Sequence, residues 1–125
     1  MKDGKHVILC IDDDQDVRQS LRAVLESAGY AVVDAPDGNE GLRKLKSEQP
    51  DLVIVDLMME EIDAGTQFVR SAKATGVDIP MFMLSSVGDD LNANVSYTDL
   101  GLTGILQKPI APARLLSTLE KTLSD

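Results

Sequence analysis

Short apolar runs alternate along this chain with longer segments in which apolar residues recur at helical spacing. The first run, His6 to Ile11, is continuous and has the length of a strand, which is typical of strands covered on both faces. Four further runs predict strands over Tyr30 to Ala35, Leu52 to Val55, Pro80 to Leu84 and Thr103 to Leu106. The apolar runs therefore predict five buried strands.

Amphipathic helices are predicted between and after these strands. Apolar residues from Val17 to Ala28 recur at helical spacing, and Gly29 stands where a helix would end. Similar patterns predict helices over Asp37 to Glu48, Ala64 to Ala74 and Pro112 to Leu123. Segment 86–102 is poor in helix formers, so its helix is predicted to be short or mobile.

Regular alternation of strands and helices predicts one α/β domain over residues 1–125, with a flavodoxin-like doubly wound fold. Parallel neighbours need long crossover connections, which four of the five predicted helices would provide. We expect a five-stranded parallel sheet with strand order 2-1-3-4-5. Ligands in such folds bind beyond the carboxyl ends of the strands, at the point where the strand order reverses.

Composition and charge narrow the function. The chain has 43% hydrophobic residues, as a globular domain requires, and a net charge of -9, which argues against direct nucleic-acid binding. The single cysteine, Cys10, lies in the first apolar run and is interpreted as a core residue of a protein from a reducing compartment. No signal peptide or membrane span is predicted, so we expect a cytoplasmic protein.

Polar side chains follow four of the five predicted strands. Asp12 and Asp13 follow the first, Asp56 the third, Ser85 the fourth and Lys108 the fifth. Three neighbouring carboxylates repel one another unless a cation joins them, and Mg²⁺ prefers such oxygen ligands. An aspartate beside the metal can attack phosphorus, while the ammonium and the hydroxyl contact phosphoryl oxygens.

Two further aspartates and the only histidine have simpler interpretations. Asp14 and Asp16 are predicted to start the first helix, where negative charge meets the positive end of the helix dipole. His6 opens a strand and is interpreted as structural.

The chain resembles the receiver domain of two-component response regulators over essentially its whole length. The resemblance rests on IDDD at 11–14, DLVIVDLMM at 51–59, Ile62-Asp63, FMLSS at 82–86 and QKPI at 107–110. It implies that Asp56 accepts a phosphoryl group, that Asp13 binds Mg²⁺ directly and that Asp12 orients the metal. The backbone carbonyl of Met58 would be a further metal ligand.

The resemblance also implies roles for the remaining site residues and for partners. Ser85 matches the switch hydroxyl and Lys108 the phosphate-contacting lysine, with a cis Lys108-Pro109 bond expected. A sensor histidine kinase or a histidine phosphotransfer protein would donate the phosphoryl group, and an unidentified downstream protein would receive the signal. The chain would be a stand-alone switch, a monomer or a phosphorylation-dependent dimer, and not an enzyme acting on metabolites.

Some positions depart from the family pattern. Ile105 replaces the usual aromatic switch residue, while Glu60 and Ala64 replace a common proline and glycine. Tyr97 could assume part of the missing aromatic's role, although a half-buried structural tyrosine is the simpler interpretation.

The same residues do not fit several rival functions. A calcium loop starting at Asp12 would need glycine at Val17 and glutamate at Ala23, and a haloacid-dehalogenase-like phosphatase would need aspartate at Met58. A flavin carrier would place an anion against IDDD, which would repel it. The alternative that remains is a receiver-like binding module that signals without phosphorylation.

Overall fold

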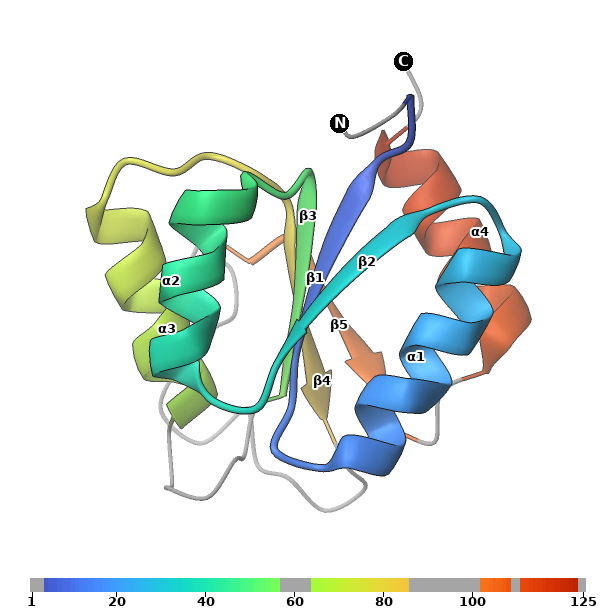
Figure 1. Ribbon diagram of the computed structural model, residues 1–125, viewed down its shortest axis with the longest axis horizontal. Coiled ribbons are helices and arrows are strands. Elements are labelled where there is room, and N and C mark those ends of the chain that lie inside the picture. The colour runs from blue at the N-terminus through green and yellow to red at the C-terminus, as the bar shows by residue number, and fades with distance from the viewer. Residues whose placement is uncertain (1–3, 57–63, 86–101, 109–110, 124–125) are drawn as a thin grey trace.

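In the part of the chain that the structure describes, a single parallel sheet lies between two pairs of helices (Figure 1). The structure, a computed structural model, describes residues 4–56, 64–85, 102–108 and 111–123. The strands are β1 (Val7–Ile11), β2 (Ala31–Ala35), β3 (Leu52–Asp56), β4 (Met81–Ser85) and β5 (Gly104–Gln107). The helices within these ranges are α1 (Gln15–Ser27), α2 (Gly38–Glu48), α3 (Ala64–Ala74) and α4 (Pro112–Leu123).

The strand order is β2-β1-β3-β4-β5, and every neighbouring pair is parallel. The predicted sheet and its order are therefore confirmed. The chain runs from β1 outward to β2 and then crosses back to β3 on the other side of β1. The order thus reverses at β1, and a crevice is expected between the carboxyl ends of β1 and β3. These ends lie at the lower edge of the sheet in Figure 1, away from both termini.

Each face of the sheet has its own core. On one face Leu9 and Ile11 of β1 pack with residues of α2 and α3, including Leu45 and Phe68. On the other face Ile8 and Cys10 belong to a core that also holds residues of α1 and α4. Burial of β1 on both faces explains why its sequence is continuously apolar.

Two aspartates begin the first two helices. The side chain of Asp14 accepts a hydrogen bond from the amide of Asp16 at 2.9 Å, and Asp37 caps α2 by accepting from the amide of Glu40 at 2.9 Å. The first helix ends at Ser27, two residues before Gly29. Gly29 has a φ of +94°, which is incompatible with a right-handed helix. The predicted end of this helix and the helix-start roles of Asp14 and Asp16 are confirmed.

The predicted helix between the fourth and fifth strands is not among those that the structure describes. Its segment, 86–102, lies outside the described residues apart from Leu102, which is buried in the core beside α2 and α3. Met58, Glu60, Tyr97 and Pro109 also lie outside them, so the expectations for these residues stay predictions. None of the described helices is both long and apolar enough to cross a membrane.

Candidate metal centre

The predicted site residues lie together at the carboxyl edge of the sheet. Asp12 and Asp13 follow β1, Asp56 ends β3, Ser85 ends β4 and Lys108 follows β5. Because all four strands are parallel and adjacent, their carboxyl ends deliver these side chains to one edge. The loops that follow each strand therefore need not be long to form a shared site.

Three carboxylates form the centre of the site. One oxygen from each of Asp12, Asp13 and Asp56 lies within 4.8 Å of the other two. Asp12 and Asp56 are 0% and 3% exposed, whereas Asp13 is exposed. The two carboxylates nearest the sheet are thus buried, whereas Asp13 is accessible to solvent. A small ion could approach the cluster from the side of Asp13.

Both the backbone and the side chain of Asp12 are held by contacts with neighbouring residues. Its amide donates to the carbonyl of Ala35 at 3.1 Å, and its Oδ1 accepts from the amide of Asp14 at 2.9 Å. Its Oδ2 lies 3.1 Å from Nζ of Lys108, an ion pair in which this buried oxygen receives no well-aligned hydrogen bond from the described part of the chain. A buried carboxylate oxygen in this situation has capacity for a further positive partner.

Lys108 lies between two of the carboxylates. Its Nζ is 3.1 Å from Oδ2 of Asp12 and 3.3 Å from Oδ1 of Asp56, and its side chain is 23% exposed. Burial of the ammonium lowers its pKa, but the neighbouring carboxylates of Asp12 and Asp56 outweigh this, and the pKa of Lys108 is raised above its ordinary value. The lysine therefore stays charged at neutral pH.

The donor set fits Mg²⁺. Carboxylate oxygens are hard ligands, and a protein site for Mg²⁺ typically supplies one or two of them and leaves the other positions to water. Asp12, Asp13 and Asp56 offer such oxygens within the space of one ion, and Oδ2 of Asp12 has no well-aligned donor among the described residues. One lysine offsets only one of the three negative charges, so a divalent cation would relieve the remaining repulsion.

Ser85 is buried at the carboxyl end of β4, the strand beside β3, and Ile105 lies on the neighbouring strand β5. The Ser85 side chain is at the end of β4, in register with Gln107 of β5. Ile105 is half-buried and pairs with Met83 in the β4-β5 register. An aliphatic side chain therefore occupies this position of β5.

Sequence reasoning missed one group of residues near the site. Asp34 of β2 forms ion pairs with Arg18 and Arg22 of α1, both at 3.0 Å. Burial raises the pKa of its carboxyl group, but the two guanidinium groups, Arg22 foremost, outweigh burial and hold this pKa below its usual range. The available signal was a lone aspartate within the apolar run AVVDA, since a partly buried charged residue in a strand favours a partner of opposite charge.

The cysteine within β1 plays no part in this chemistry. Burial raises the pKa of the Cys10 thiol to about 12, and the charge of Asp34 adds to the effect. The thiol is therefore neutral and inert at physiological pH, in accord with its interpretation as a core residue.

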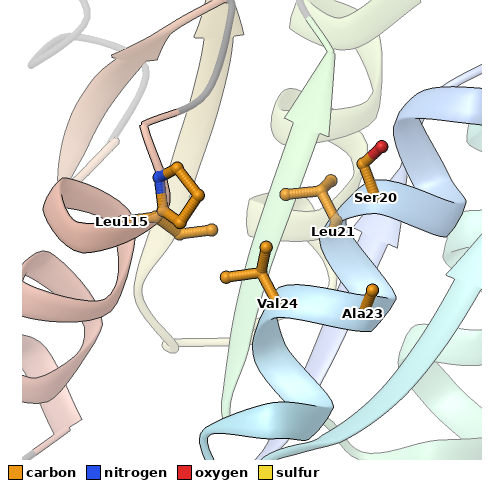
Figure 2. A pocket seen from close by; sticks show the side chains of 6 residues that line it. Ser20, Leu21, Ala23, Val24 and Leu115 are labelled. Carbon is orange, nitrogen blue, oxygen red and sulfur yellow. The ribbon is translucent and has the colours of Figure 1, made fainter.

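A groove elsewhere on the surface has a different character. It lies between α1 and α4, has a volume of about 400 Å³ and is lined by Ser20, Leu21, Ala23, Val24, Pro112 and Leu115. Figure 2 shows Leu21 and Val24 of α1 facing Leu115 of α4 across it. None of these six residues carries a charge, so together they offer no ligand set for a metal ion or a phosphoryl group.

Comparisons with known proteins agree with this geometry. Residues 8–120 match the family model of the response regulator receiver domain. The chain is 39% identical over 116 residues to the response regulator MprA of Mycolicibacterium vanbaalenii, covering 93% of this chain and 49% of that protein. The chain thus spans about half the length of the curated relatives it matches.

Solved structures give the same result for the fold. The chemotaxis protein CheY4 of Vibrio cholerae superimposes with a TM-score of 0.86 at 31% identity, covering 96% of this chain and all (100%) of that one. A putative response regulator from Chloroflexus aurantiacus gives a TM-score of 0.83 at 31% identity, covering 97% of this chain and 99% of that one. With its parallel sheet and its acidic cluster at the strand ends, the chain belongs to the family of response regulator receiver domains of two-component systems.

Proposed function

We propose that this receiver domain accepts a phosphoryl group on Asp56 from a phosphohistidine of a partner protein, in a reaction that depends on Mg²⁺. The observation that carries the proposal is the meeting of Asp12, Asp13 and Asp56 within 4.8 Å, with Lys108 paired to two of them. This combination offers a nucleophile, a cation site and a fixed positive charge at one sheet edge.

The metal would be held by Asp12, Asp13 and Asp56, with the Met58 carbonyl added by resemblance to the family. When bound, Mg²⁺ supplies positive charge to the oxygens of the transferring phosphoryl group. The chain's contribution is to gather the carboxylates before the ion arrives, at the cost of their mutual repulsion.

Asp56 is proposed as the nucleophile. One carboxylate oxygen forms a bond to phosphorus as the bond between phosphorus and the donor's imidazole nitrogen breaks, and the leaving nitrogen keeps the electron pair. Lys108 then pairs with a phosphoryl oxygen, since its raised pKa keeps it protonated at neutral pH. The hydroxyl of Ser85, on the adjacent strand end, is suited to donate a hydrogen bond to another phosphoryl oxygen.

The proposed outcome is a change in protein contacts. The partner upstream would be a sensor histidine kinase or a histidine phosphotransfer protein, because the chain's only histidine is His6, which lies just before β1. The domain would act in the cytoplasm as a switch that catalyses only its own phosphorylation and dephosphorylation. Its downstream target would be another protein, bound by the monomer or by a phosphorylation-dependent dimer.

The test is labelling with acetyl phosphate, read by intact mass. We expect one added phosphoryl group in the presence of Mg²⁺, none with excess chelator, and none for Asp56→Asn. Asp16→Asn is a matched control, since it removes an aspartate of the first turn of α1 and should label as the native chain does. Labelling of Asp56→Asn at the native rate would refute the acceptor, and an unlabelled native chain would favour the binding module that signals without phosphorylation.

A further inference from the structure

Arg18 of α1 contacts the backbone that carries the metal site. Its Nη1 donates a hydrogen bond to the carbonyl oxygen of Asp12 at 2.6 Å. The same guanidinium donates from Nε to Oδ2 of Asp34 at 3.0 Å, and its side chain is 15% exposed. One planar group thus joins β2 to the peptide between Asp12 and Asp13.

The orientation of Arg18 is set by Asp34. Because the five N–H groups of a guanidinium are fixed in one plane, binding Nε to a carboxylate also fixes the direction of Nη1. The second oxygen of Asp34 accepts from Arg22 at 3.0 Å, so the carboxylate is held from both sides. The Asp34 carbonyl in turn accepts from Lys44 of α2 at 2.7 Å, which anchors this residue to the helix on the other face of the sheet.

Asp12 is the point at which these contacts meet the site. Its amide is bound by Ala35, its carbonyl by Arg18 and its carboxylate by the Asp14 amide and Lys108. Residues 34 and 35 of β2 therefore hold Asp12 twice, once directly and once through Arg18. The peptide that Arg18 binds leads directly into Asp13, the exposed member of the cluster.

We propose that Arg18 is a positioning residue for the metal site, which fixes the Asp12–Asp13 backbone through the Asp12 carbonyl and is itself oriented by Asp34. This proposal rests on the proposed function, because it assumes that the cluster binds Mg²⁺. Mg²⁺ requires near-ideal octahedral geometry, so a loosened ligand backbone lowers its affinity. Groups that orient metal ligands typically contribute about tenfold or more to metal affinity.

The chain provides a matched control in Arg22. Arg18→Met and Arg22→Met each remove one guanidinium from Asp34 and keep an unbranched apolar stem, but only the first removes a donor to Asp12. Arg18→Lys restores a cation that can reach either partner. Asp34→Asn keeps Arg18 but removes the carboxylate that orients it. This variant therefore tests whether the ion pair with Asp34 is needed for the contact between Arg18 and Asp12.

The experiment measures the Mg²⁺ Kd by NMR titration of backbone amides, without any phosphodonor, and hydrogen exchange of the Asp14 amide in metal-free protein. We expect Arg18→Met to weaken Mg²⁺ binding about tenfold and to speed exchange at Asp14. Arg18→Lys should recover part of the affinity, and Asp34→Asn should lose less than Arg18→Met. Arg22→Met keeps both contacts of Arg18 and should bind Mg²⁺ nearly as the native chain does.

An unchanged Mg²⁺ Kd in Arg18→Met, or an equal loss in Arg22→Met, would overturn the positioning role while leaving the proposed function intact. If Arg18→Met does not fold, Asp34→Asn decides alone, and an unchanged Kd in that variant refutes the proposal. If the native chain is labelled on Asp56 and Arg18→Met has the native Mg²⁺ Kd, the proposed function stands and the positioning role fails. A native chain that binds no Mg²⁺ overturns both.

Discussion

The backbone amide of Lys108 donates a hydrogen bond to the carbonyl of Ser85 at 2.8 Å. This bond continues the parallel pairing in which Ser85 is in register with Gln107. The pairing of β4 with β5 therefore fixes the backbone positions of Lys108 and Ser85 relative to each other. Because side chains of successive strand residues point to opposite faces, a one-residue shift between β4 and β5 would turn one of them away from the site.

Lys108 is expected to compete with Mg²⁺ for the carboxylates. Its ammonium pairs with both Asp12 and Asp56, so its removal leaves two buried carboxylates with greater need of a cation. In Lys108→Met we expect Mg²⁺ to bind several-fold more tightly. Labelling of Asp56 should slow about tenfold or more, because the ammonium that stabilises negative charge on the phosphoryl oxygens is lost. Calorimetric titration and intact mass measure the two effects. The exposed Lys46 provides a control, Lys46→Met, and weaker Mg²⁺ binding in Lys108→Met would contradict the competition.

Repulsion within the acidic cluster should lower the stability of the metal-free fold. Asp13→Asn removes one of three carboxylates whose oxygens lie within 4.8 Å of one another, and Asp13 is exposed, so little packing is lost. At the effective dielectric constant near a protein surface we expect a gain of about 1 kcal/mol in the free energy of unfolding without Mg²⁺.

The same substitution should remove the stabilisation by Mg²⁺. A ligand that binds only the folded state raises the free energy of unfolding in proportion to the logarithm of its concentration above Kd. The native chain should therefore gain stability with added Mg²⁺, and Asp13→Asn should gain much less. Urea unfolding with Mg²⁺ or with chelator measures both effects, and a metal-free Asp13→Asn less stable than the native chain would argue against repulsion.

Asp34 should make stability depend on acidic pH. The ion pairs with Arg22 and Arg18 hold the folded pKa of this carboxyl below its unfolded value, so its contribution is present above the unfolded pKa and is lost as pH falls through the folded pKa. Asp34→Asn should cost about 1 kcal/mol at neutral pH, since the pairs are partly exposed. The difference in the free energy of unfolding between Asp34→Asn and the native chain should shrink as pH falls below about 4.

Urea unfolding of both proteins at neutral and acidic pH tests this dependence. Asp78→Asn, at an exposed position between α3 and β4, provides the control for a simple change in net charge. A difference between Asp34→Asn and the native chain that stays constant across this pH range would show that ionisation of Asp34 is not its source.

The sequence predicts the sheet and the location of the site because both depend on local patterns. Apolar runs identify β1 and β3, and the aspartates and lysine that follow the strands are visible as letters. Parallel order then brings the strand ends to one edge without any knowledge of side-chain contacts. Element ends are less accurate: α1 starts at Gln15 rather than Val17, because apolar spacing marks only the buried face of a helix.

The contacts around Asp34 could not be predicted in this way. Its place in an apolar strand indicates that it has a partner, but the choice of Arg18 and Arg22 depends on how α1 crosses β2. That crossing is set by packing between residues distant in sequence, which periodicity does not encode. The link from Arg18 to the Asp12 carbonyl is still less visible, because a backbone acceptor leaves no trace in the residue pattern.

Asp37 should contribute to stability through the start of α2. Its side chain accepts from the amide of Glu40 at 2.9 Å, which satisfies one of the amides left unpaired at the start of the helix. Asp37→Ala should cost about 1 kcal/mol, and Asp37→Ser should retain most of the native stability because serine also caps. Thermal and urea unfolding measure both variants, and equal losses in the two would show that the cap is not the cause.

Gly41 is required where α2 lies against β1 and α3. A Cβ added there would lie 2.5 Å from Cδ1 of Ile11 and 3.0 Å from the ring of Phe68, and both side chains are buried in the same core. Gly41→Ala should therefore cost about 1 to 2 kcal/mol despite the higher helix propensity of alanine. In Gly38→Ala, on the same helix, the added Cβ meets only Cβ of Phe68 at 3.7 Å, an ordinary contact, and no loss is expected. Ile11→Val removes the crowded methyl group, so the double variant should lose less than the sum of the single losses; additive losses in urea unfolding would exclude this contact as the cause.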